Sequence, residues 1–396
     1  MGVSQHEGWI DRLKGILITL VVLGHAVGSA AITADERVQS FFSGVYRVIY
    51  LFHMPAFFLL SGMLWKRPAG SFGAFALRKM KRLLVPFWVF GIFSMIIYWL
   101  FAGQVAIQDA SGYWLGTMRE RHWWAPLFAL VTGSSYPGTD GFKCNGVLWF
   151  LPCLFSMQCC YWMVDRVLSD GCKGFKMLIG VMCVLGLVIK ERLRPVWIPL
   201  QLDMVLRYAF YFMLGVVGVT YFKRIQIKRY LLLGLVVVWI IVAWNFPFDA
   251  RNDYYYGLWG CTVMMGATGS VLALCVAKMF KFRGVKIMGM MSLGIMLIHK
   301  FPLLFFQTKV PFVAKWLAGS CLVAVITCVG MALVVIMLSY VGTKIILHWC
   351  PWALGVGTQT VSKRCLWRVF RGTRMLRDRR SRIEASRSEI TTYHAD

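Results

Sequence analysis

The sequence has little charge and few acidic residues. Only 15% of its 396 residues are charged, and Lys and Arg (43) far outnumber Asp and Glu (17). Soluble domains carry about a quarter charged residues. The hydrophobic residues, 59% of the chain, instead gather in long runs, and about 20 apolar residues let one α-helix cross a bilayer. Because the alternation of membrane β-strands is absent, we expect an all-α polytopic membrane protein.

Other absences narrow the functional class. The twelve cysteines include no CxxC pair and no Cys/His spacing typical of a metal site, so we expect no metal. No histidine is followed four residues later by aspartate, the pattern of soluble-type phospholipid acyltransferases, and no Gly-x-Ser-x-Gly elbow occurs. No nucleic-acid-binding fold accompanies the net charge of +26, so nucleic acid is not an expected partner. The first residues do not read as a cleavable signal.

Hydropathy predicts about ten transmembrane helices. The predicted spans are residues 15–34, 44–65, 83–103, 145–164, 176–190, 205–222, 230–247, 255–277, 286–307 and 316–346. A further apolar stretch, 123–139, is interrupted by two prolines and two glycines, and we expect it to be re-entrant or interfacial.

The distribution of Lys and Arg predicts the orientation. If the N-terminus is cytoplasmic, most basic residues fall in segments on the same side, and the bias alternates with the ten spans. We therefore expect both termini in the cytoplasm, in a cell membrane. Residues 351–396 form a predicted basic cytoplasmic tail, which we expect to rest on anionic membrane lipid.

Three histidines lie inside predicted spans, where polar groups are costly and therefore mark candidate sites. They are His25, His53 and His299, in the first, second and ninth spans. Each alone could simply form a hydrogen bond between helices. Lys14 precedes His25 by eleven residues, about 16 Å along a helix. A cation at the mouth and an imidazole within the membrane suit a reaction with an anionic cytoplasmic donor.

Five stretches resemble, in order, the motifs of the membrane acyltransferase-3 family, most closely its fucose 4-O-acetylase-like branch. They are WIDRLKGILITLVVLGHA (9–26), FHMPAFFLLSGML (52–64), RKMKRLLVPFW (78–88), GVLWFLPCLF (146–155) and MGMMSLGIMLIHKFPLL (288–304). The resemblance covers about residues 8–345, which predicts an acyltransferase-3-like transmembrane domain over 1–350, of the stand-alone type.

The resemblance implies an integral membrane O-acyltransferase. Such enzymes move acetyl, or another acyl group, from a cytoplasmic donor to sugars of surface or exported glycans. The family pattern places a basic residue eleven positions before a catalytic histidine, which corresponds here to Lys14 and His25. Much of the family has arginine at the first position. Because lysine cannot make the same bidentate phosphate contact, the mode of donor recognition stays open.

These inferences define an expected site. Lys14, Lys81 and Arg82 are expected to bind the phosphates of acetyl-CoA or another acyl-CoA. His25 would be the general base or a transient acyl acceptor, and His53 would assist it. Candidates for oxyanion stabilisation or for binding the acceptor, a glycan or lipid-linked sugar, are Trp149, Ser61, Ser292 and His299. The segment 103–146 is the expected acceptor-side lid.

Other functions are compatible with buried histidines. A proton-coupled secondary transporter, or an exporter of a polysaccharide precursor, would use them for proton coupling, and a non-catalytic partner of a polysaccharide synthase would not use them chemically. The scarcity of carboxylates within the spans and the absence of an inverted repeat weigh against a carrier. The acceptor sugar, acetyl versus succinyl, a covalent acyl-histidine and the oligomeric state are left open by the sequence.

Overall fold

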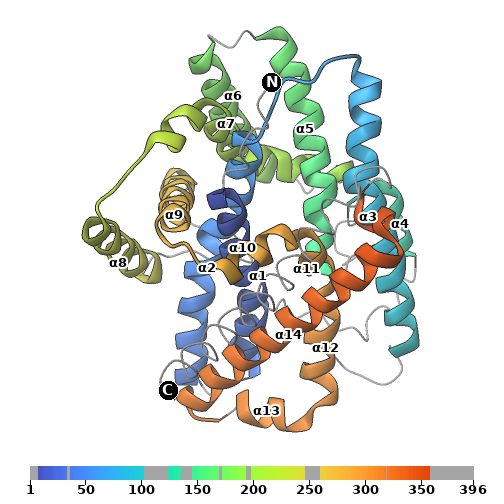
Figure 1. The fold of residues 1–396 in the computed structure, drawn as a ribbon, viewed down its shortest axis with the longest axis vertical. Helices are drawn as coiled ribbons and strands as arrows, with labels where there is room; N and C mark the ends of the chain where they lie inside the picture. The colour runs from blue at the N-terminus through green and yellow to red at the C-terminus, as the bar shows by residue number, and fades with distance from the viewer. Residues whose placement is uncertain are drawn as a thin grey trace, which may run out of the picture.

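The computed structural model describes residues 8–33, 36–101, 124–134, 145–168, 172–192, 198–245, 259–317 and 319–356. Every regular element within these ranges is a helix (Figure 1). The α-helices are α1 Gly8–Thr33, α2 Glu36–Met63, α3 Phe72–Phe101, α4 Ala125–Thr132, α5 Phe150–Val167, α6 Lys173–Arg192, α7 Leu202–Arg224, α8 Arg229–Asn245, α9 Trp259–Met279, α10 Arg283–Met290, α11 Ser292–Ile298, α12 Lys300–Lys309, α13 Pro311–Leu317 and α14 Cys321–Trp349. Short 3₁₀ helices are η2 Gly146–Trp149, η3 Pro199–Gln201 and η4 Pro351–Leu354.

Six of the described helices are long and apolar enough to cross a membrane, and a bent pair makes a seventh. The six are Val38–Met63, Phe72–Ile97, Gly146–Val167, Pro199–Arg224, Gly260–Met279 and Cys321–Trp349. The seventh joins Arg283–Met290 to Ser292–Gln307 with a bend of 69°. The chain is thus a multi-pass helical membrane protein.

The predicted count of about ten spans is not confirmed, although each predicted segment coincides with a helix. Segments 15–34, 176–190 and 230–247 correspond to α1, α6 and α8, which lie outside the seven. α8 has only 17 residues, and α1 carries Asp11, Arg12 and Lys14 in its first two turns. The stretch 123–139 contains α4, whose eight residues extend about 12 Å and cannot cross a bilayer.

Glycines allow two pairs of helices to cross closely. α2 and α7 meet where Gly62 faces the carbonyl of Phe212 and Gly215 faces the carbonyl of Leu59; a Cβ on either glycine would overlap these oxygens. α1 and α10 meet in the same way at Gly289, which lies against the carbonyl of Asp11. These crossings fix the positions of α1 and α2, the two helices that carry His25 and His53.

Basic side chains near the ends of α1 and α9 cap the ends of neighbouring helices. Arg12 Nε donates to the carbonyl of Ala277 at 2.7 Å, near the end of α9. Lys278 in turn donates to the carbonyls of Phe222, Lys223 and Ile225 at the end of α7. Because these carbonyls have no partner within their own helix, the basic side chains complete the hydrogen bonding of both helix ends.

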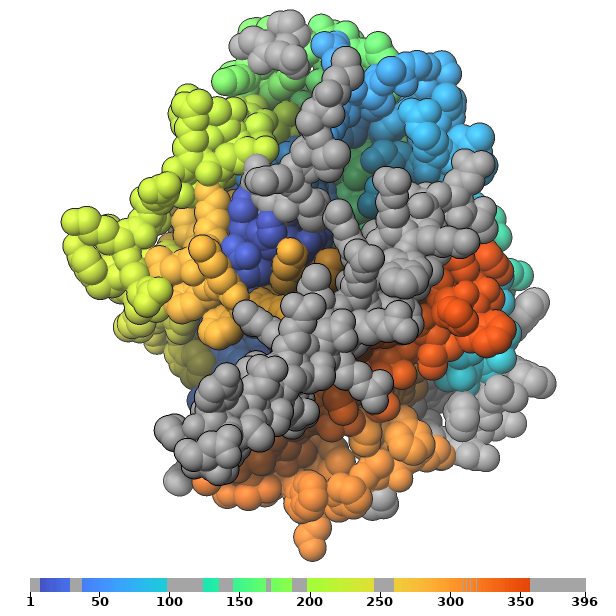
Figure 2. Space-filling view, viewed as in Figure 1, coloured from blue at the N-terminus to red at the C-terminus, as the bar shows by residue number. Residues whose placement is uncertain are grey.

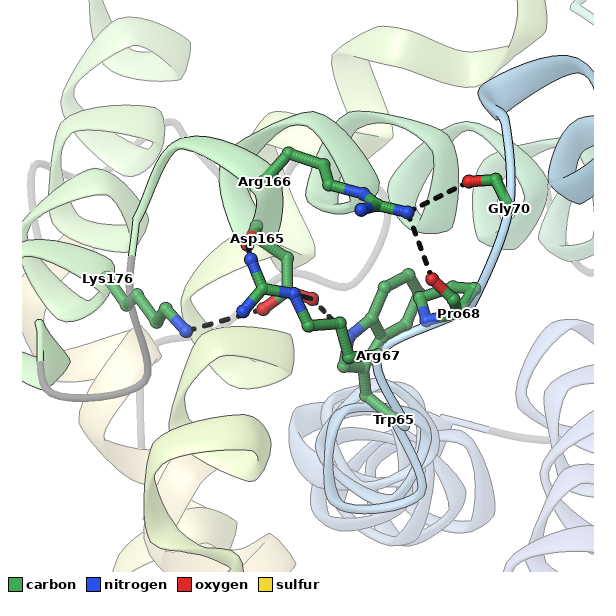
Figure 3. A network of polar contacts seen from close by, with 7 residues as sticks. All are labelled: Trp65, Arg67, Pro68, Gly70, Asp165, Arg166 and Lys176. Atoms are coloured by element: carbon green, nitrogen blue, oxygen red, sulfur yellow. Dashed lines mark hydrogen bonds and ion pairs between the residues drawn. The ribbon is translucent and has the colours of Figure 1, made fainter.

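All six segments that the sequence predicts to be cytoplasmic meet at one end of the bundle. Besides the contacts of Arg12 and Lys278, Arg67 and Lys176 both contact Asp165 (Figure 3), and Gly355 packs on the backbone of Arg82. We call this the basic end. The grouping of these segments at one end, as the charge pattern predicts, is therefore present in the fold; the number of crossings and the side of the membrane that the basic end faces stay predictions.

The outer surfaces of two helices are apolar. Val238 and Ile241 on α8, and Leu333 and Met337 on α14, are all exposed. In a multi-pass membrane protein these surfaces contact lipid rather than water. By contrast, α1 is enclosed: Leu13, Leu17 and Val22 are fully buried, and in Figure 2 atoms of α1 (dark blue) lie in a hollow beside the gold and orange segment.

Candidate active site

The three histidines of the predicted spans come together in the interior of the bundle. His25 lies on α1, His53 on α2, and His299 at the junction of α11 and α12. The rings of His25 and His299 have their centroids 5.4 Å apart. Tyr50 Oη lies 3.4 Å from His25 Nδ1, and the rings of Tyr50 and His53 are 4.8 Å apart. We call His25, Tyr50, His53 and His299 the histidine cluster.

Backbone carbonyls fix the protonation pattern of two of these rings. His53 Nδ1 lies 2.9 Å from the carbonyl of Ile49, and His299 Nδ1 lies 3.1 and 2.7 Å from those of Ile295 and Met296. Because a carbonyl can only accept, Nδ1 carries the proton in both rings. In the neutral state, Nε2 of His53 and of His299 therefore presents a lone pair.

The three imidazoles differ in burial. His299 is fully buried and His53 is 4% exposed, whereas His25 is half-buried. Among the residues that the structure describes, His299 Nε2 has no hydrogen-bond partner. Of the three histidines, His25 is thus the most accessible, and His299 keeps an unused hydrogen-bond acceptor.

Sequence reasoning missed one residue of this cluster and two residues beside it. Tyr50 lies three residues before His53 and therefore on the same helix face, a spacing that could have indicated it. Lys300 lies close enough to interact electrostatically with both His25 and His299, and a cation inside a predicted span was the signal for it. Asn145 is fully buried and donates from Nδ2 to the carbonyl of Leu297 at 2.9 Å; at the edge of a predicted span it resembles an ordinary boundary residue.

Two of the three predicted donor-binding residues lie together at the basic end. Lys14 Nζ is 3.8 Å from Asp11 Oδ1. Burial lowers the pKa of the Lys14 ammonium, Asp11 raises it, and the nearby Arg82 lowers it further. Lys14 is eleven residues from His25 on α1, about 16 Å along the axis. Lys81 is exposed on α3, one residue from Arg82, and no contact places it against Lys14.

The remaining predicted residues are not gathered at the histidine cluster. Trp149 stacks on Tyr208, with ring centroids 5.7 Å apart, and Tyr208 stacks on Phe58 of α2 at 4.5 Å, so one face of the indole is packed against protein. Ser61 lies eight residues after His53, about 12 Å along α2, and Ser292 lies seven residues before His299, about 10 Å along α11.

Parts of the predicted site lie outside the described residues. Of the predicted lid 103–146, only 124–134 and 145–146 are described, and of the tail 351–396 only 351–356. Within the described ranges, no group of three or more His, Cys, Asp or Glu side chains is placed to hold a metal ion.

Comparison with known proteins decides the family. A family model described as "Acyltransferase domain", that of the acyltransferase 3 family, matches residues 7–340. The chain belongs to the acyltransferase 3 family. The matched range contains Lys14 and the whole histidine cluster, so the resemblance expected from five short motifs is confirmed at the level of the family. The finer assignment to the fucose 4-O-acetylase-like branch stays a prediction.

One curated relative is similar over a short region. Nodulation protein NolL of Sinorhizobium fredii (strain NBRC 101917 / NGR234) is 39% identical over 64 residues, which are 16% of this chain and 17% of that protein. No solved structure matches. The family and the apolar helices together identify a membrane acyltransferase.

Proposed function

We propose that this acyltransferase moves an acetyl or similar acyl group from cytoplasmic acyl-CoA to a hydroxyl group of a surface or exported glycan, or of its lipid-linked precursor. The observation that carries the proposal is the histidine cluster: ionisable rings inside a helical bundle, with Lys14 and Arg82 at the basic end of the same bundle. Buried ionisable groups within a membrane domain are functional by default.

The donor would bind at the basic end. Acyl-CoA carries several phosphate charges, and Lys14, Lys81 and Arg82 are cations on α1 and α3 at that end. Its thin thioester arm would then follow α1 inwards towards His25, about 16 Å away. This arrangement puts the anionic part of the donor in water and its reactive carbon among the helices.

His25 would act as the general base. The acceptor hydroxyl gives its proton to His25 while its oxygen attacks the thioester carbonyl, and the negative oxygen that forms is stabilised by the Lys300 ammonium. Collapse forms the ester and breaks the C–S bond, and the departing CoA thiolate takes the proton from His25. In a two-step variant His25 attacks the thioester and releases the CoA thiolate, which leaves an acyl-imidazole. The alcohol then attacks this acyl group, the ester forms as the acyl–nitrogen bond breaks, and the thiolate takes the proton of the alcohol.

His53 would support this chemistry through Tyr50. Its Nδ1 is tied to the carbonyl of Ile49, and its ring packs against Tyr50, whose hydroxyl faces His25 Nδ1. A hydrogen bond from Nδ1–H of His25 to Tyr50 Oη would hold His25 in the tautomer whose Nε2 is free to take the proton of the acceptor hydroxyl. Among the other predicted acceptor-binding residues, His299 lies in the cluster, and Trp149, before α5, would contact a part of the acceptor farther from the reaction. Ser61 and Ser292 lie between the histidines and the basic end, on the side of the donor.

The membrane orientation belongs to the same proposal. The basic end would face the cytoplasm in a cell membrane, with both termini on that side and the tail 351–396 on anionic lipid. The acceptor would then enter from the opposite end.

The test compares the surface glycan of cells with and without the intact gene by mass spectrometry. We expect the glycan to lose one acetyl unit per repeat when the gene is absent. The purified protein should transfer label from radiolabelled acetyl-CoA to that unmodified glycan. No transfer, together with uptake or release of a solute by vesicles that contain the protein, would instead identify a transporter.

A further inference from the structure

Two fully buried polar side chains meet the same turn of α11 from different elements. Asn145, at the start of η2, donates from Nδ2 to the carbonyl of Leu297. His299 donates from Nδ1 to the carbonyls of Ile295 and Met296. Consecutive carbonyls of one helical turn therefore hold both side chains, which places the amide of Asn145 beside the histidine cluster.

Each side chain keeps one polar atom that has no hydrogen-bond partner in the described part of the chain. These atoms are Asn145 Oδ1 and His299 Nε2. The amide orientation follows from the contact with a carbonyl, because only the NH₂ group can donate to it. The tautomer of His299 follows in the same way, so both unused atoms are hydrogen-bond acceptors.

Two acceptor atoms without partners indicate a ligand that donates hydrogen bonds. A buried acceptor atom without a partner destabilises the folded protein, because the atom has lost its hydrogen bonds to water and gained none in return. Ionised phosphates and the thioester carbonyl only accept hydrogen bonds, whereas alcohol hydroxyls donate. The chemistry of the pair therefore fits hydroxyl groups, or the amide N–H groups of the thioester arm of acyl-CoA.

The position of Asn145 in the fold favours the hydroxyl groups. Asn145 precedes η2 and α5, whose 18 residues extend about 27 Å, and the far end of α5 carries Asp165 at the basic end. Asn145 thus lies at the end of α5 opposite to the side from which the acyl-CoA would enter. The group that approaches from Asn145 is the acceptor.

We propose that Asn145 Oδ1 and His299 Nε2 form a subsite for hydroxyl groups of the acceptor other than the one that is acylated. The inference rests on the proposed function and adds a specificity: the acceptor is a polyol, with at least one free hydroxyl besides the reacting one. A substrate that lacks that hydroxyl leaves a buried acceptor atom unpaired and is rejected for that reason.

The first experiment uses the unaltered protein in lipid nanodiscs with radiolabelled acetyl-CoA. The acceptors are methyl glycosides, their single-deoxy analogues and cyclohexanol, which has one hydroxyl. We expect kcat/KM to fall about tenfold to a hundredfold for at least one deoxy analogue, and at least as far for cyclohexanol. Equal kcat/KM for cyclohexanol and the glycosides would overturn the subsite while leaving the acyltransferase intact. Transfer to none of these alcohols or to the glycan would instead refute the proposed function.

The second experiment assigns the discrimination to Asn145. In Asn145→Leu we expect kcat/KM for the full sugar to fall at least about tenfold, with the KM for acetyl-CoA unchanged and the discrimination against one deoxy analogue lost. Asn145→Ser, whose hydroxyl oxygen can still accept a hydrogen bond, should recover part of the discrimination. Asn245→Leu is the matched control, because Asn245 also donates to a helix carbonyl, that of Ile241 at 2.8 Å, but is exposed on α8.

Three results would overturn the assignment. If Asn145→Leu instead raises the KM for acetyl-CoA, the two acceptor atoms bind the amides of the thioester arm. An equal loss for full and deoxy sugars would show a structural role alone, and unchanged discrimination would show that only a water joins the two atoms. If Asn145→Leu does not elute as a folded species in size-exclusion chromatography, the deoxy series on the unaltered protein and Asn145→Ser decide the question.

Discussion

Two of the regions in which the molecule buries polar side chains treat them in opposite ways. At the basic end, Asp165 is 3% exposed and both carboxylate oxygens have partners: Trp65 Nε1 at 3.3 Å and Lys176 Nζ at 3.4 Å. Arg67 lies 3.8 Å from the carboxylate and also donates to the backbone carbonyl of Asp165 at 2.6 Å (Figure 3). Arg166 donates to two carbonyls of the loop after α2. This network joins the loop after α2 to α5 and α6.

The histidine cluster is the other region. His53 and His299 are anchored through Nδ1, and His299 Nε2 is left without a partner among the described residues. Buried polar groups in folded proteins are almost always paired. The difference indicates that the Asp165 network stabilises the fold, whereas the histidine cluster keeps hydrogen-bonding capacity for a substrate.

The largest expected effect is the loss of activity when the histidine cluster is changed at His25. His25→Ala removes the proposed base, so acyl transfer should fall about 10²- to 10⁴-fold. The amount of folded protein should stay close to that of the unaltered chain, since His25 is half-buried and its contact with the Tyr50 hydroxyl is long, at 3.4 Å. Transfer to the glycan, measured per folded molecule, checks this, and an unchanged rate would remove His25 from the mechanism.

The opposite result is expected at the basic end. Lys176→Met leaves the buried Asp165 carboxylate without its lysine and should lower the free energy of unfolding by about 3 kcal/mol. Thermal unfolding followed by size-exclusion chromatography measures the shift. Activity per folded molecule should not change. Lys173→Met on the same helix is the control, because Lys173 is exposed, and a shift of similar size there would contradict the role of the pair.

A smaller effect is expected where the basic end meets the proposed donor. Lys14→Ala should raise the KM for acetyl-CoA about tenfold with kcat little changed, because it removes one charge-assisted phosphate contact. Lys14→Arg should retain most of the affinity, and rising salt should weaken binding by the unaltered protein more than by Lys14→Ala. Unchanged KM in Lys14→Ala would place the phosphates elsewhere.

The smallest effect concerns orientation within the cluster. Tyr50→Phe deletes only the hydroxyl that faces His25 Nδ1 at 3.4 Å, and kcat should fall about threefold to tenfold with KM values unchanged. Tyr340→Phe on α14, where the ring packs under Lys344, is the control for loss of a hydroxyl from a membrane helix. Equal rates for Tyr50→Phe and the unaltered protein would separate Tyr50 from the chemistry.

The sequence predicts the basic end better than the histidine cluster, for a physical reason. Charge bias and hydropathy are local properties of the sequence, so the placement of Lys14, Arg67 and Lys176 at one end of the bundle can be predicted from it. The number of spans cannot be read as well, because α8 is short and the span before α14 bends by 69° at Met291, where the sequence has no proline to announce a break.

The cluster itself depends on contacts between distant parts of the chain. His25 and His299 are far apart in sequence, and only the crossing of α1 with the segment α10–α11 brings their rings to 5.4 Å. Sequence reasoning selected both because each is costly in a membrane. It could not select Asn145, because the importance of Asn145 arises from its contact with Leu297. It also grouped Ser61 and Ser292 with the histidines, although each lies about two helical turns away along its own helix.

The most direct test measures the two regions side by side. The unaltered protein, His25→Ala and Lys176→Met are purified into nanodiscs, and each is given radiolabelled acetyl-CoA and glycan from cells that lack the gene. We predict equal transfer per folded molecule for the unaltered protein and Lys176→Met, and none above background for His25→Ala. Transfer by His25→Ala at the rate of the unaltered protein would contradict the assignment of the chemistry to the histidine cluster.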